Sequence, residues 1–221
     1  MNGKKDRNLP AYTRGEERAN MVTHIVGGAF GIWVLVSCIL KAAFRGDGWD
    51  MVGACIYGGS MILLYTVSSI YHGLRVCAGK RVMRVIDHCT IYLLIGGTYT
   101  PILFSAIRPG FPGWAWTIFG LVWGCAGAAT VFTAIDLKRY ARLSMVCYIA
   151  MGWCIVMAVK PAVASVPVPG LLWLLAGGIA YTVGAVLYGL GKTRRYMHSV
   201  FHVFVLLGSV LQYICIIRYC L

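Results

Sequence analysis

Seven long apolar runs dominate the sequence, and no other feature restricts the fold as strongly. Each run is close to the about 20 residues that a helix needs to cross the hydrocarbon core of a bilayer. Lipid cannot satisfy backbone hydrogen-bonding groups and the runs are too long for barrel strands, so each is expected to be helical. The runs cover residues 21–44, 51–74, 86–107, 113–135, 143–163, 170–190 and 198–217. The sequence therefore predicts an all-α membrane protein, a bundle of seven transmembrane helices.

The composition agrees with a membrane-embedded chain. Of the 221 residues, 59% are hydrophobic and 12% are charged, whereas a typical soluble domain has about 25% charged residues. The loops between the runs are short, which predicts antiparallel neighbours in a single domain, residues 1–221. Residues 1–20 are expected to form a short polar segment before the first helix. The apolar run that follows is of spanning length, so no cleavable signal peptide is expected.

Basic residues are distributed unevenly between the two ends of the predicted helices. Fifteen of the 20 Lys and Arg residues lie in the N-terminal segment and in the loops after the second, fourth and sixth runs. The positive-inside rule then places the N-terminus in the cytoplasm and the C-terminus outside. The net charge of +13 is thereby explained by topology, and no nucleic-acid partner is expected.

With this orientation, all five histidines lie near the cytoplasmic ends of the helices. They are His24, His72, His88, His198 and His202. Asp87 is the only acidic residue within the seven runs. An acid in a membrane-spanning segment is by default a candidate functional residue. This end of the bundle is therefore the predicted location of the functional site.

The spacing of these residues indicates metal chemistry. Ser68 and His72 are four residues apart and share a helix face, as do His198 and His202. Three imidazoles from two helices, with a fourth position open, are typical of a catalytic zinc centre. Asp87 could then act as a base or hold the water on the metal. The hydroxyl of Ser68 could donate to the same water or to a substrate oxygen.

Simpler interpretations exist for the same residues taken one at a time. A single histidine at a helix end is also typical of a polar anchor at the lipid headgroups. Asp87 could cap the third helix, and His88, about 100° away around the helix, is expected to face elsewhere. Glu17, Asn20 and His24 either support the site or form a solvated start of the first helix. The combination of motifs at one membrane depth favours a site.

The same residues closely resemble the hemolysin III family, the bacterial branch of the progestin and adipoQ receptor (PAQR) family within the CREST superfamily. The stretches that carry the resemblance are EERANMVTH (16–24), YGGSMILLYTVSSIYH (57–72), DHCTIYLLIGGTYTP (87–101), YIAMGW (148–153) and HSVFHVFVLLGS (198–209). They are spread over nearly the whole chain in a specific order.

The resemblance implies a seven-helix bundle with a cytoplasmic N-terminus, in a bacterial plasma membrane. It also implies Zn²⁺ held by His72, His198 and His202 near the cytoplasmic face. By the same match, Asp87 corresponds to the acid that contacts the water on the metal, and Ser68 to the hydroxyl beside it.

Three functions are compatible with these features. The first is a zinc-dependent hydrolase that cleaves an amide or ester bond of a membrane lipid, as a ceramidase does. The second is a receptor-like or signalling protein in which zinc only stabilises the helices. The third, a pore-forming hemolysin, is disfavoured because every helix is apolar nearly all round and no amphipathic pore-lining helix is evident.

Overall fold

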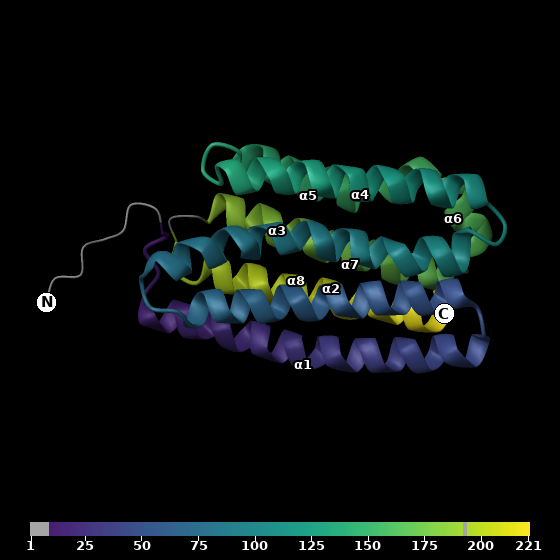
Figure 1. Cartoon of the computed structure of the whole chain (residues 1–221), viewed down its shortest axis with the longest axis horizontal. Helices are drawn as coiled ribbons and strands as arrows, with labels where there is room; N and C mark the ends of the chain where they lie inside the picture. The colour runs from purple at the N-terminus through teal and green to yellow at the C-terminus, as the bar shows by residue number, and fades with distance from the viewer. Residues whose placement is uncertain (1–8, 192–193) are drawn as a thin grey trace, which may run out of the picture.

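The seven predicted spans are seven helical segments in the computed structural model, which describes residues 9–191 and 194–221. They lie side by side as a bundle, with α1 beginning at one end and Leu221 at the other (Figure 1). All regular elements among the described residues are helical. The predicted all-α bundle of seven membrane-spanning helices is confirmed, and the chain is a multi-pass membrane protein.

Several spans consist of more than one helical element. Three short elements occur inside spans: a π-helical turn in the third, a 3₁₀ turn in the fifth and a second π-helical turn in the seventh. In chain order the elements are α1 (Arg14–Arg45), α2 (Gly48–Gly73), α3 (Ala78–Pro101), η1 (Ile102–Ile107), α4 (Pro112–Ile135), α5 (Ala141–Gly152), η2 (Cys154–Ala158), α6 (Val159–Ser165), α7 (Val168–Leu190), α8 (Met197–Cys215) and η3 (Ile216–Cys220).

Two helices begin well before their apolar runs. A capping box starts α1: the hydroxyl of Thr13 accepts from the Glu16 amide at 3.2 Å, and the Glu16 carboxylate accepts from the Thr13 amide at 2.8 Å. The N-cap of α3 is Cys77. Asp87 therefore lies in the third turn of α3, and its interpretation as the cap of this helix is wrong.

The fifth span is interrupted where the sequence predicts one continuous helix. Its α-helical hydrogen bonding stops at Gly152, and a 3₁₀ turn leads into α6. Pro161 lacks an amide donor and cannot continue the regular ladder. The Tyr99 hydroxyl of α3 donates to the Gly152 carbonyl and accepts from the Ile155 amide, both at 2.9 Å. Tyr99 thus satisfies two backbone groups that the interruption releases inside the membrane.

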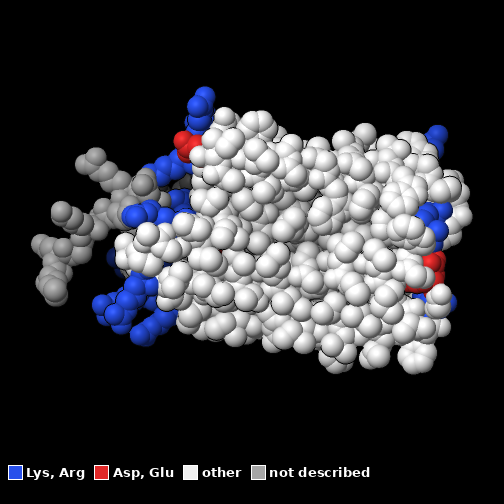
Figure 2. All heavy atoms as spheres, in the orientation of Figure 1, with Lys and Arg blue, Asp and Glu red and all other residues white. Residues whose placement is uncertain are grey.

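Charged side chains gather at the two ends of the bundle, and the long middle section of its surface is uncharged (Figure 2). Many Lys and Arg residues lie at the end where α1 begins, whereas fewer lie at the opposite end (Figure 2). The uncharged belt between them is the surface that lipid would contact. Within the belt, large apolar side chains such as Trp33 and Val131 are exposed, as expected for helices that face hydrocarbon.

Candidate metal centre

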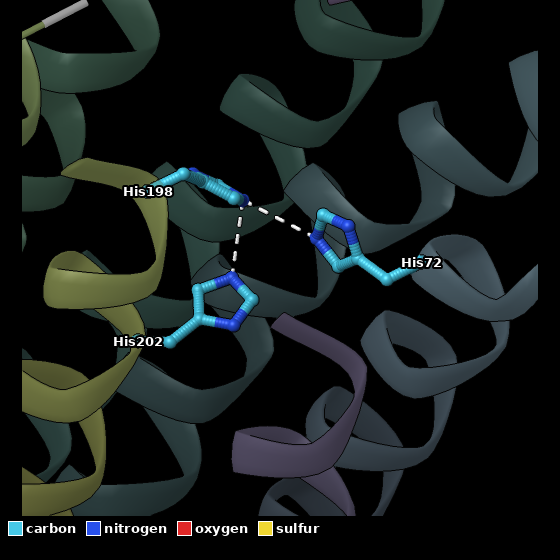
Figure 3. Close-up of side chains that lie close together, drawn as sticks. All are labelled: His72, His198 and His202. Atoms are coloured by element: carbon cyan, nitrogen blue, oxygen red, sulfur yellow. Dashed lines mark hydrogen bonds between the residues drawn. The ribbon is translucent and has the colours of Figure 1, made fainter. Parts of the chain in front are cut away.

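Three histidine side chains converge near the end of the bundle where α1 begins (Figure 3). His72 comes from the last turn of α2, and His198 and His202 come from successive turns of α8. The Nε2 atom of His198 lies 3.3 Å from Nε2 of His72 and 3.1 Å from Nε2 of His202. One nitrogen from each ring lies within 4.8 Å of the others, and the group could hold a metal ion.

The opposite nitrogens of two of these rings have hydrogen-bond acceptors. His72 Nδ1 lies 2.7 Å from a carboxylate oxygen of Glu17, and His202 Nδ1 lies 3.2 Å from the carbonyl oxygen of Asn20. A proton on Nδ1 leaves the lone pair of Nε2 directed at the shared point between the rings, as in metal-bound histidines. The Nδ1 atom of His198 is buried and has no partner among the described residues.

Glu17 is itself held by a buried lysine. Lys80 of α3 is 3% exposed, and its ammonium donates to Glu17 Oε1 at 2.7 Å and to the Leu74 carbonyl at 2.9 Å. A buried ammonium needs such partners because it has left water. Three helices, α1, α2 and α3, therefore fix the orientation of His72.

Two more rings pack against the cluster. His24 of α1 stacks on His202, with ring centroids 3.6 Å apart and ring planes 10° apart. Both nitrogens of His24 are buried without a hydrogen-bond partner among the described residues. Tyr12, which precedes α1, stacks on His198 at 5.2 Å and 16°. Burial raises the pKa of the Tyr12 phenol, so Tyr12 remains a neutral hydrogen-bond donor.

Glu17, Asn20 and His24 belong to the site rather than to a solvated helix start. Asn20 and His24 are buried, and Gly27 lets α1 approach α2 so closely that the Tyr65 ring fills the space a Cβ atom would need. The same Tyr65 ring contacts His24 edge-on. These packing interactions place the polar face of α1 against His72 and His202.

Asp87 and Ser68 lie beside the cluster rather than within it. Ser68, one turn before His72, is 1% exposed and its hydroxyl has no partner with hydrogen-bonding geometry among the described residues. The Asp87 carboxyl lies near both Ser68 and His72 and lines the same cavity as Ser68. It is not among the groups that converge on the metal position.

His88 is not one of the converging histidines, but it lines the same cavity, and its Nδ1 atom lies 3.8 Å from the Asp87 carboxylate, so the expectation that it faces elsewhere is wrong. Its Nδ1 atom lies 2.8 Å from the Arg84 carbonyl oxygen, and its own carbonyl accepts from the Tyr148 hydroxyl at 2.8 Å. These contacts hold His88 against its own helix and α5 at the wall of the cavity. It contributes no nitrogen to the cluster.

A cavity of about 680 Å³ leads from the cluster into the bundle. Ser68, Asp87, His198 and His202 line its polar end, and mostly apolar side chains of α3, α5, α6 and α7 line the rest. The far end is lined by residues such as Ile102 and Leu171. The arrangement joins a set of potential metal ligands, a carboxyl and a hydroxyl to a long apolar chamber.

Sequence reasoning did not single out Tyr12 or assign Lys80 and Arg84 to the site. Tyr12 lies outside every apolar run, and the two basic residues were counted only for topology. One local signal was available for Tyr12. The Thr13 and Glu16 spacing is a capping box, which starts α1 directly after Tyr12 and so brings this ring to the mouth of the site.

Comparison with known proteins supports the predicted family. Residues 12–213 match the family described as haemolysin-III related. The hemolysin-3 homolog of Bacillus subtilis (strain 168) is 40% identical over 209 residues, which cover 95% of this chain and 96% of that protein. The hemolysin-3 of Bacillus cereus is 36% identical over 206 residues, 93% of this chain and 92% of that protein.

A more distant relative is the human monocyte to macrophage differentiation factor. It is 26% identical over 213 residues, which cover 92% of this chain and 84% of that protein. The predicted resemblance is confirmed by these matches over nearly the full length. The chain belongs to the haemolysin-III-related family.

Proposed function

We propose that this protein is a zinc-dependent membrane hydrolase that cleaves an amide or ester bond of a lipid. The observation that carries the proposal is the spacing of the three Nε2 atoms. Ligand nitrogens about 2.0–2.1 Å from a tetrahedral zinc stand about 3.3 Å apart. The Nε2 separations of 3.1 Å (His198 to His202) and 3.3 Å (His198 to His72) fit this value, and three protein ligands leave the fourth position open.

His72, His198 and His202 would hold the ion, and Glu17 and the Asn20 carbonyl would keep two of the rings in the ligating tautomer. When bound, zinc supplies Lewis acidity that activates water and polarises a carbonyl group. Asp87, in the same cavity, would accept a proton from the attacking water as general base. The hydroxyl of Ser68 would donate a hydrogen bond to the carbonyl oxygen as negative charge develops on it.

The cavity supports a lipid as the substrate. Its walls beyond the histidines are mostly apolar and run deep into the membrane-spanning part of the bundle. Ligand sites of this size bury most of the surface of an apolar ligand and orient it with a few polar groups. A lipid chain in this chamber would place a bond near its polar end beside Asp87 and Ser68.

A receptor-like role with structural zinc is the alternative, and one observation favours it. The three ligands come from α2 and α8, and Glu17 adds α1, so a metal ion would tie three helices together. Such a protein would gain stability from zinc and would show no lipid turnover.

We further propose a cytoplasmic N-terminus in a plasma membrane, which would put the histidine cluster at the inner leaflet. The uneven distribution of Lys and Arg supports this orientation.

The test combines metal analysis with lipid analysis on the purified protein in lipid nanodiscs. We expect about one zinc per chain and lipid products that accumulate with time in the unmodified protein. His202→Ala should lose both, whereas His88→Ala, which alters a histidine outside the cluster, should keep its zinc. Zinc without lipid turnover would reject the hydrolase in favour of a structural metal. Equal loss of zinc in the His88 and His202 variants would reject the ligand assignment.

A further inference from the structure

Two basic side chains line the polar end of the cavity. Arg84 lies on α3, one turn before Asp87, and Lys138 lies in the loop between α4 and α5. Residues three apart share a helix face, so the Arg84 side chain and the Asp87 carboxyl meet the cavity together. Arg84 also lies close enough to Tyr12 and Tyr188 to interact electrostatically with both rings. The guanidinium therefore belongs to the mouth of the cavity.

Among the described residues that line this mouth, the positive and negative charges are unequal. Asp87 is the single acid among the described residues that line the cavity, whereas Arg84 and Lys138 are both basic. A divalent ion on the three histidines would add two positive charges. Concave sites with charges of one sign and apolar walls concentrate ligands of the opposite sign. The mouth thus favours a negative group over a neutral or zwitterionic one.

The shape of the cavity restricts what the negative group can be attached to. Its lining on α3 and the first residue of η1 extends from Arg84 to Ile102, which corresponds to about 27 Å at 1.5 Å per helical residue. This length approaches the about 30 Å thickness of the hydrocarbon core. A small soluble anion would leave the long apolar wall unfilled. A molecule with one negative end and a long apolar remainder matches both parts.

We propose that Arg84 and Lys138 form a headgroup site that selects phospholipids of net negative charge. Guanidinium groups bind phosphate oxygens through two parallel hydrogen bonds, and lysine adds a mobile point charge. The proposal deepens the proposed function, because it rests on a lipid being the ligand of this cavity. It names the class of lipid and the two residues that discriminate it, and it does not require turnover.

The test measures headgroup preference directly. The full-length protein is incubated in detergent with equal amounts of dioleoylphosphatidylglycerol and dioleoylphosphatidylcholine, repurified, and its retained lipids are quantified by mass spectrometry. The unmodified protein should retain phosphatidylglycerol preferentially. Arg84→Gln should reduce this preference about tenfold, the effect expected for a lost charge-assisted hydrogen bond. Arg84→Lys should keep part of it, and Lys138→Gln should lower it by less than Arg84→Gln.

Arg81→Gln is the matched control. Arg81 lies three residues before Arg84 on α3, is exposed and does not line the cavity, and its loss changes the net charge equally. An equal reduction in the Arg81 and Arg84 variants would overturn the headgroup site and leave only general attraction of anionic lipid to the basic end. An undiminished preference in both Arg84→Gln and Lys138→Gln would also overturn it.

Zinc content and lipid turnover in the same samples distinguish this inference from the proposed function. Lost headgroup preference in Arg84→Gln, with no turnover in the unmodified protein, would support the headgroup site and reject the hydrolase. Lipid turnover by the unmodified protein, together with an unchanged headgroup preference in the Arg84 variants, would support the hydrolase and reject the headgroup site. Melting temperatures establish that each variant is folded, and Arg84→Lys, which retains the charge, remains informative if Arg84→Gln does not fold.

Discussion

The Nδ1 atom of His72 lies 2.7 Å from Oε2 of Glu17, and the other oxygen of the same carboxylate lies 2.7 Å from the Lys80 ammonium. A carboxylate behind a histidine fixes the ring and increases its basicity toward a metal. The first helix, which supplies none of the three converging nitrogens, therefore contributes to the candidate metal centre through Glu17.

Glu17→Gln should weaken zinc binding about 10- to 100-fold, the usual effect of changing the partner of a ligand. The amide can still accept from His72 but no longer carries charge, and Lys80 loses its counter-ion. Competition with a chromogenic chelator measures the affinity, and the melting temperature of the apo protein should fall as well.

Lys80→Met in the Glu17→Gln background separates the loss of zinc affinity from the loss of thermal stability. This double variant removes the buried ammonium that has lost its counter-ion, so it should recover much of the melting temperature while zinc binding stays weak. Unchanged zinc affinity in Glu17→Gln would show that the carboxylate does not position His72.

Asp87→Asn should retain zinc at saturating metal, because the three imidazoles remain. Asn can still accept a hydrogen bond but is a poor base, so lipid turnover should fall by about 10²- to 10⁴-fold. Turnover is measured under saturating zinc to exclude an effect of metal loss. Full activity in Asp87→Asn would remove Asp87 from the mechanism. Ser68→Ala is a comparison at a neighbouring residue, and its lipid turnover should fall by less.

His24→Phe should keep about one zinc per chain, because three imidazoles suffice for a catalytic zinc site and the phenyl ring can still stack on His202. His24→Ala removes the stacked ring and leaves a void, so it should lower the melting temperature more than His24→Phe does. Elemental analysis and thermal unfolding of both variants provide the check. Loss of zinc from His24→Phe as complete as from His202→Ala would make His24 a ligand.

A C-terminal alkaline phosphatase fusion should be active, and a C-terminal green fluorescent protein fusion should be dark. Both outcomes follow from the cytoplasmic N-terminus and seven spans. Fusions truncated after Arg195, before α8, should show the opposite pattern because one span is missing. Matching results from the truncated and full-length fusions would contradict the span count, and opposite results with both signals inverted would contradict the orientation.

Much of the fold was predictable from local sequence properties. The length and apolarity of each run determine that it spans a membrane, whatever its neighbours are. The interruption of the fifth span was only partly predictable, because Pro161 is visible in the sequence but the Tyr99 hydroxyl that makes the break tolerable comes from α3. Such compensation depends on which helices touch, and the apolar pattern of one segment carries no information about it.

The site was predictable to the extent that it follows from helical spacing. His198 and His202 are one turn apart, so their shared face could be read directly from the sequence. That Glu17 would reach His72, or that Tyr12 would stack on His198, depends on how α1 packs against α2 and α8. A charged residue near a helix start has many alternative environments, and only the tertiary contacts distinguish them.

The separation of 126 residues between His72 and His198 determines when this centre can form during biogenesis. At about 5–20 residues per second of translation, the ribosome completes His198 roughly 6–25 s after His72. During that interval, the nascent hairpin of α1 and α2 offers a single imidazole of the triad, which is too few to retain zinc. A metal ion held by all three histidines could therefore bind only after the last helix has been synthesised.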